Sequence, residues 1–225
     1  MPMGQAPVLM RIDAHAGVRA LLGQIEPFLR CQRVIVVGSG PTVHEDLERL
    51  QPRETDKIIA VNGGASACPR IDVLVTNGRD YRNGTPTDAT LWTDARWELH
   101  RRMLAQMVGR HVPVLVLLMR DTEEQTRDRL AAQGVTWDTA IHVSPSDRIQ
   151  IAQSVGVKDY ETAFQLSSGV IAWALAVACN ADTVETAGIG MTPGYHYLDT
   201  LPDEFPTRRH ATSDQEAIAW LSQIR

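Results

Sequence analysis

A glycine-rich turn follows the first strand-like run of this chain and has the residues for nucleotide chemistry. Arg33 to Val37 is apolar and β-branched, Gly38 to Pro41 reads Gly-Ser-Gly-Pro, and Val43 to Leu50 has a helical pattern. A turn between a strand and a helix can present backbone N–H groups to a phosphate. The same residues also suit a purely structural turn, with the proline pre-set near the helix N-terminus.

The turn does not match the two standard nucleotide-binding fingerprints. A dinucleotide motif needs a third glycine and an acidic residue at the end of the second strand, where this chain has Asn62. A Walker motif needs a lysine after the glycines, and none follows. The sequence also has no Asp-x-Asp, no Gly-x-Ser-x-Gly and no paired zinc histidines. These absences count against a metal-dependent nucleotide-sugar clamp of that type, a serine hydrolase and a zinc protease.

Neutral polar residues come at the ends of the first three strand-like runs. Ser39 follows the first, Asn62 the second and Asn77 the third. Because parallel strands end at the same edge of a sheet, we expect these side chains to gather there. Amides and hydroxyls bind ribose hydroxyls, a pyrimidine edge or a sugar carboxylate without adding charge. The alternative is that the asparagines only make turns.

Strand-like and helix-like segments alternate along the chain, which predicts an α/β fold. The expected strands are 33–37, 57–61, 72–76, 112–119, 140–143 and 183–187. The expected helices are 43–50, 92–109, 121–133 ended by Gly134, 168–180, and 213–224 with Ser213 or Thr212 as N-cap. We therefore predict a single Rossmann-like domain over residues 1–225, with a mostly parallel sheet and helices on both faces. The long segment 192–209 is the expected lid over the site.

Composition narrows the class of protein and its partners. The chain has 225 residues, a formal net charge of -5 and no basic run, so nucleic acid is not an expected partner. There is no signal peptide and no apolar run of the ~20 residues that span a bilayer. Cys31, Cys68 and Cys179 have no Cys-x-x-Cys spacing, and we expect buried free thiols. These features predict a cytoplasmic protein.

Five short motifs, in this order, resemble the bacterial sialyltransferases of glycosyltransferase family 42. They are VVGSGPT, IAVN, VLVTN, SSGVIAWALAVACNADTVETAGIGM and RRHATSDQEAIAWL, and they span roughly Arg33 to Leu221. The resemblance implies the GT-A-like variant of the Rossmann-like fold found in that family. It also implies an inverting transfer of sialic acid or a related ulosonic acid from a CMP-sugar to a glycan or lipid-linked glycan acceptor. Neither a metal nor a cofactor is then expected.

The resemblance also implies roles for individual residues. His210 would be the general base that takes the proton from the acceptor hydroxyl, since an imidazole with a reference pKa of about 6.5 is partly neutral at physiological pH. The start of the helix at Ser168 suits an anion independently of any family, because helix N-termini carry positive partial charge. The substrate-binding residues implied are Gly38, Ser39, Gly40, Pro41, Asn62, Asn77, Gln165, Ser167, Ser168, Gly169, Thr192, Arg208 and Arg209.

The chain departs from the family pattern at several of these places. Ser39 replaces an asparagine, Gln165 an arginine, Gly190 an aspartate, and Met191-Thr192 a Phe-Tyr pair that supports the leaving phosphate. A phenol or a cation is needed there, because departing CMP develops negative charge. The candidates are Tyr195 and Tyr197, less directly His196, and Arg208 and Arg209. The donor therefore stays open among CMP-activated ulosonic acids.

Two other functions stay open beside the transferase. An MptE-like pterin diphosphokinase shares the Gly-x-Gly-Pro and apolar-helix motifs, but it needs acidic metal ligands. Asp72 and Asp80 are expected near the end of the third strand, but no paired carboxylates are evident. A catalytically degenerate nucleotide-binding protein would explain the departures from the family pattern. A homo-oligomer is compatible with each of the three.

Overall fold

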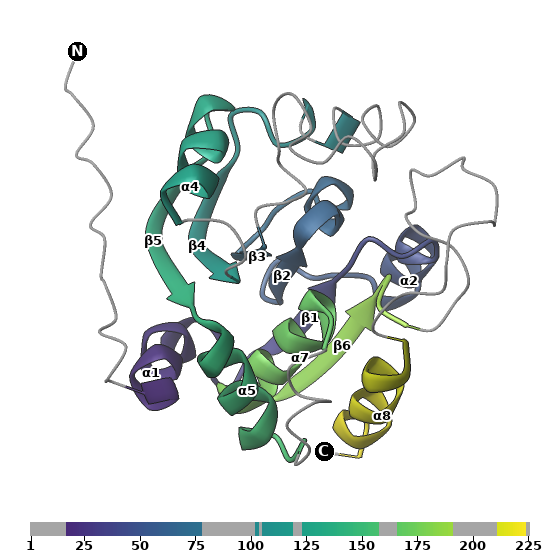
Figure 1. Cartoon of the computed structure of the whole chain (residues 1–225). Coiled ribbons are helices and arrows are strands. Elements are labelled where there is room, and N and C mark those ends of the chain that lie inside the picture. The colour runs from purple at the N-terminus through teal and green to yellow at the C-terminus, as the bar shows by residue number, and fades with distance from the viewer. Residues whose placement is uncertain are drawn as a thin grey trace, which may run out of the picture.

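A parallel sheet organises the protein (Figure 1). The structure, a computed structural model, describes residues 17–77, 102–103, 105–118, 123–157, 166–190 and 211–223. Within these ranges six strands pair in parallel, in the order β5-β4-β3-β2-β1-β6. The strands are β1 (Arg33–Val37), β2 (Lys57–Val61), β3 (Val73–Thr76), β4 (His111–Leu118), β5 (Thr136–Val143) and β6 (Thr183–Ala187). The predicted Rossmann-like α/β architecture is confirmed.

Helices cover both faces of the sheet, because side chains of each buried strand alternate between two apolar clusters. Val34 and Val36 of β1 belong to one cluster, and Ile35 and Val37 belong to the other. The first face packs against α1 (Gly17–Leu29), α5 (Pro145–Ser154), α7 (Ser168–Ala178) and α8 (Ala211–Leu221). The second packs against α2 (Val43–Leu50), the 3-10 helix η1 (Asn62–Ala67) and α4 (Glu123–Ala132).

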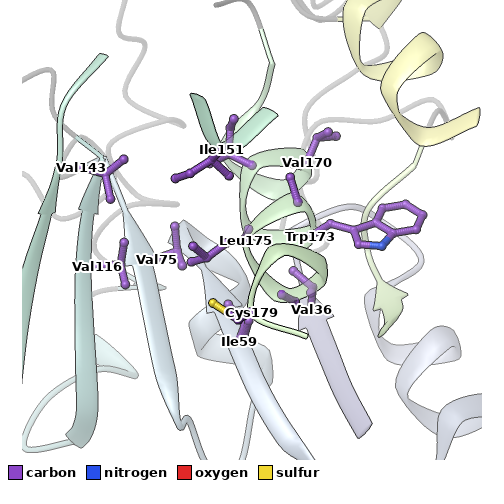
Figure 2. Close-up of a cluster of buried hydrophobic side chains, with 14 of the residues drawn as sticks. Val36, Ile59, Val75, Val116, Val143, Ile151, Val170, Trp173, Leu175 and Cys179 are labelled. Carbon is purple, nitrogen blue, oxygen red and sulfur yellow. The ribbon is translucent and has the colours of Figure 1, made fainter. Parts of the chain in front are cut away.

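Helix α7 forms the centre of the first face. Every residue from Val170 to Ala176 is buried, because the helix contacts the sheet on one side and α1, α5 and α8 on the others. Figure 2 shows Leu175 and Cys179 turned toward the apolar side chains of the strands, with Trp173 pointing away from them. A helix that is apolar all round, as predicted for this segment, is therefore enclosed by protein.

Charged side chains concentrate at the N-terminal edge of the sheet, opposite the strand ends discussed below. Arg33, the first residue of β1, contacts Asp56 at 2.6 Å, Glu185 at 2.5 Å and the carbonyl oxygen of Leu50 at 2.9 Å. Burial would raise the pKa of the Asp56 carboxyl, but the Arg53 N–H and the Arg33 charge outweigh it and hold that pKa below its ordinary value. This cluster ties β1, β2 and β6 together.

Several expected boundaries are corrected. Helix α8 begins at Ala211, so Thr212 and Ser213 lie inside it and neither is its N-cap. Strand β5 begins four residues earlier than expected, because its first half alternates exposed and buried residues, as an edge strand does. The expected helix 92–109 lies mostly outside the described residues, as does the expected lid 192–209.

Two helices were not predicted, although the sequence holds signals for both. Helix α5 has a capping box, in which Ser144 and Asp147 satisfy each other's backbone N–H groups, and Pro145 stands at its first position. Helix α1 buries Leu21, Ile25 and Leu29, which recur at a four-residue spacing. No helix within the described ranges is long and apolar enough to cross a membrane.

The cysteines are free thiols, as expected, but they do not share one environment. Cys68 and Cys179 are buried, and burial raises the pKa of each thiol to about 12. Cys31 is exposed, which corrects the expectation for that residue. It lies in a tight turn between α1 and β1, where its φ is 56°.

Leu175→Ala tests whether α7 carries the core. Leu175 is 1% exposed, so the truncation leaves a cavity and is expected to lower the free energy of unfolding by about 2 to 5 kcal/mol. Val108→Ala is the control, because Val108 is 60% exposed and should change it by less than about 0.5 kcal/mol. Urea denaturation measures both, and equal losses would contradict this packing.

Candidate functional site

The segments that follow β1, β2, β3 and β6 lie at one edge of the sheet. These strands are neighbours in the order β3-β2-β1-β6 and are all parallel. The chain runs from β1 toward β5 in one direction and returns to place β6 on the other side of β1. In open α/β sheets, ligands bind beyond the carboxyl ends of the strands where the order reverses. In this sheet that position is between β1 and β6.

Three glycines bring the ends of β1 and β6 into direct backbone contact. The Gly38 N–H donates to Ala187 O, and the Gly40 N–H donates to Gly188 O, each at 2.8 Å. A methyl group added at Gly38 or at Gly40 would lie 2.6 Å from Gly188 O, closer than carbon and oxygen approach. We call Gly38, Gly40 and Gly188 the glycine junction. It leaves backbone, rather than side chains, at the switch point of the sheet.

Asp46, in the first turn of α2, connects this helix to the glycine junction by a hydrogen bond. Its Oδ2 accepts the Gly188 N–H at 3.0 Å and the Thr42 hydroxyl at 2.9 Å. Partial burial favours the neutral carboxyl, but the hydrogen bonds from Gly188, Thr42 and Arg49 together outweigh it and hold the Asp46 pKa below its ordinary value. The charged carboxylate therefore joins the turn after β1 to the turn after β6.

The two predicted strand-end asparagines meet each other. The Asn77 backbone N–H donates to Asn62 Oδ1 at 3.1 Å, so the ends of β2 and β3 are connected. Asn62 has φ 48°, a left-handed conformation that asparagine tolerates. One acceptor position of its side chain is used within the protein.

Helix η1, which begins at Asn62, packs against the end of β1 beside the glycine junction. Gly64 lies so close to the end of β1 that an added methyl group would sit 2.6 Å from Gly38 O. Gly64 is therefore required by its close packing against the end of β1. Arg110 supports the far end of η1 by donating to Ala65 O at 2.9 Å.

The N-terminus of α7 lies on the other side of the glycine junction. Ser167 is its N-cap, and the Ser167 hydroxyl accepts the Val170 N–H at 3.3 Å. Added methyl groups at Gly38 and Gly169 would lie 2.7 Å and 3.3 Å from the Ile189 side chain, so Ile189 separates the junction from the helix. The first-turn N–H groups of Ser168 and Gly169 have no acceptor inside the helix, and such groups favour an anion.

The predicted site residues thus fall into two groups. One group lies along this edge, in an unbroken series of contacts: Gly38, Ser39, Gly40, Pro41, Asn62, Asn77, Ser167, Ser168 and Gly169. The other group lies outside the described residues: Gln165, Thr192, Tyr195, Tyr197, Arg208, Arg209 and His210, with His196. The role of each residue in substrate binding or catalysis stays a prediction.

Sequence reasoning missed Gly188, Asp46 and Asp214, which hold this edge together. The sequence shows a glycine directly after the β6 run. Only the φ of Gly188, 60°, and its close contacts explain why a glycine is needed there. The two aspartates have no local signal. Asp46 contacts a residue 142 positions away, and Asp214 contacts Ser167, 47 positions away.

The acidic ligands considered for a diphosphokinase do not lie at this edge together. Asp72 precedes β3, at the opposite edge of the sheet from Asn77. There it accepts the Ile58 N–H at 2.9 Å and contacts Lys57 at 3.5 Å, which corrects its placement near the strand end. Asp80 is outside the described residues. Within the described ranges, no three His, Cys, Asp or Glu side chains gather as a metal site would require.

Gly188→Ala is expected to destabilise the protein by at least about 2 kcal/mol. A left-handed alanine costs about 1 to 2 kcal/mol, and its methyl group would lie 2.8 Å from Val43 Cβ. Gly190→Ala is the matched control, because an added methyl group there meets nothing within 4 Å. Urea unfolding compares the variants; a neutral Gly188→Ala would contradict the glycine junction.

Asp46→Ala should remove part of the acid sensitivity of the fold. Because the Asp46 pKa lies below its ordinary 3.8 in the folded chain, the unfolded chain takes up its proton first as the pH falls. The stabilisation is therefore complete above about pH 5 and is lost as the pH falls through the folded pKa. At pH 7, the free energy of unfolding of the variant should be about 1 to 3 kcal/mol lower than that of the wild type. It should also fall less steeply as the pH is lowered. Glu48→Ala, on the exposed side of α2, should leave this pH dependence unchanged.

Comparison with known proteins gives a distant likeness to solved structures. No protein-family model matches the chain, and no curated protein matches it either. Among solved structures, the chain is similar to the crystal structure of an alpha-2,3-sialyltransferase from Campylobacter jejuni in apo form. The sequence identity is 14% over 86% of this chain and 72% of that chain, with a TM-score of 0.46. A likeness of this size bears on neither the reaction nor its substrates.

Proposed function

We propose that this protein is a glycosyltransferase that moves sialic acid or a related ulosonic acid from a CMP-sugar to a glycan acceptor. The observation that carries the proposal is the series of contacts from Asn77 through Asn62, η1 and the glycine junction to the start of α7. It lines the switch point of the sheet with amides and backbone N–H groups. Four of the five sequence motifs that resemble family 42 reach these elements, and the described part of the fifth is α8.

The chemistry of this edge fits such a donor. A CMP-ulosonic acid carries a phosphate and a carboxylate, and both accept hydrogen bonds. The first turn of α7 offers N–H groups in the positive field of the helix dipole, and the Asn62 side chain offers an amide NH₂. We assign the nucleotide to Gly38–Pro41 and the carboxylate or phosphate to Ser167–Gly169.

The proposed reaction is a single displacement with inversion. The acceptor oxygen attacks the anomeric carbon, the bond from that carbon to the phosphate oxygen of CMP breaks, and the acceptor proton passes to the imidazole of His210. CMP leaves with the bonding electron pair. Tyr195, Tyr197, Arg208 and Arg209 are the proposed donors that stabilise the charge of the leaving phosphate. No metal is assigned a role.

Titration with CMP and CMP-sialic acid tests the proposal directly. We expect CMP to bind in EDTA, CMP-sialic acid to be hydrolysed slowly in EDTA, and His210→Ala to retain CMP binding while losing turnover. A requirement for ATP and magnesium would replace the proposal by the pterin diphosphokinase. CMP binding without turnover, unchanged in His210→Ala, would identify a degenerate nucleotide-binding protein. Absence of CMP binding would overturn the assignment of the site.

Asn62→Gly tests how much the Asn62 side chain contributes to CMP binding while the backbone conformation is kept. Glycine adopts the left-handed conformation of this position, where φ is 48°, so the change removes the amide without backbone strain. We expect CMP to bind about tenfold more weakly, the effect of losing one charge-assisted hydrogen bond. Asn180→Gly is the matched control, since Asn180 has φ 56° and precedes β6 at the opposite edge. Calorimetry should give it the wild-type affinity; equal losses would contradict a role for Asn62.

A further inference from the structure

Two charged side chains from different helices hold one peptide group at the start of α7. Arg148 of α5 donates from Nη2 to the carbonyl oxygen of Leu166 at 2.8 Å. Asp214 of α8 accepts the N–H of Ser167 on Oδ1 at 2.8 Å. Both bonds go to the peptide that joins Leu166 to Ser167. We call this arrangement the peptide clamp.

Both members of the clamp are removed from solvent. Arg148 is 9% exposed and Asp214 is 5% exposed. Burying a charged group costs free energy that a hydrogen bond only partly offsets, so buried charges contribute little to stability on balance. They do impose direction, because the cation faces the oxygen of the peptide and the anion faces its N–H. The clamp therefore fixes the orientation of this peptide more than it strengthens the fold.

Asp214 makes a hydrogen bond that, in a capping box, the third residue of the same helix makes to the N-cap N–H. In α5, Asp147 is the third helical residue and accepts the N–H of its own N-cap, Ser144, at 2.9 Å. The third helical residue of α7 is Val170, which has no acceptor. Asp214 makes the equivalent bond to the Ser167 N–H from α8. The N-cap of α7 is thus completed by another helix, and that helix begins directly after His210.

We propose that Arg148 and Asp214 are positioning residues of the nucleotide site, an inference that rests on the proposed function. By orienting the Leu166–Ser167 peptide, they fix the position of the first turn of α7. Asp214 also connects this turn to α8, the helix that follows the proposed base.

Hydrogen exchange in the ligand-free protein tests the clamp by itself. In Asp214→Ala, the Ser167 and Val170 amides should exchange at least about tenfold faster, because a hydrogen bond to a charged group is lost. In Asp214→Asn they should stay near the wild-type rate, since the amide oxygen accepts the same N–H. Arg148→Met, which keeps the aliphatic stem, should behave as Asp214→Ala does. Unchanged exchange in both truncations would overturn the clamp.

CMP affinity measured by calorimetry then tests the link to the site. Asp214→Ala and Arg148→Met should bind CMP about tenfold more weakly, and Asp214→Asn should restore most of the affinity. Leu130→Ala is the control for lost stability, because Leu130 is buried in α4 on the opposite face of the sheet, away from the α7 peptide. Equal weakening in Leu130→Ala would mean general loosening and would overturn the positioning role.

The two proposals fail in different ways. If wild-type protein does not bind CMP, the proposed function is wrong and Arg148 and Asp214 position no nucleotide site, whatever the exchange rates show. If wild-type protein binds CMP but the Asp214→Ala and Arg148→Met variants bind it equally well, the proposed function stands and the positioning role is wrong. Weakened binding that Asp214→Asn restores supports both.

Discussion

The contact between the turns after β1 and β6 is the constraint on which the rest of this edge depends. Two backbone hydrogen bonds of 2.8 Å join these turns, and they form only because neither turn carries a side chain at the contact. With the backbones this close, η1 packs against the end of β1 on one side, and Ile189 fills the space before α7 on the other. A larger residue at Gly38, Gly40 or Gly188 would separate the two strand ends. It would thereby move apart every group that lines the edge.

The sheet has two chemically different edges. At the N-terminal edge, Arg33 pairs with both Asp56 and Glu185, so these charges are used within the protein. At the C-terminal edge, the described side chains in the series of contacts are amides, hydroxyls and glycines, and the charges of Asp46 and Asp214 are directed at backbone N–H groups. Neutral hydrogen-bond donors suit an anionic ligand, because they can bind it without the cost of desolvating a second ion.

The sequence predicted those parts of the fold that depend on local patterns. The β-branched run of β6 and the helix from Val43 to Leu50 have the predicted bounds, because the residues that define them are adjacent in the chain. The position of Asn62 at a strand end was also readable. Its bond to the Asn77 backbone was not, and neither were the contacts of Asp46 and Asp214, since each joins segments whose approach is set only by the packed sheet. Helix α1 contains Pro27, and a proline in this position usually indicates that a helix is interrupted.

The pairing of β1 with β6 has a consequence for how the protein folds. Arg33 lies opposite Thr183 in the register of these strands, so about two thirds of the chain separates these two neighbours in the sheet. Contacts between residues so distant in sequence form slowly, because the loop between them must be closed first. During synthesis, β1 through β5 emerge from the ribosome before β6 exists, and one side of β1 waits without its partner. Nascent chains should therefore form the glycine junction abruptly, only once β6 has docked.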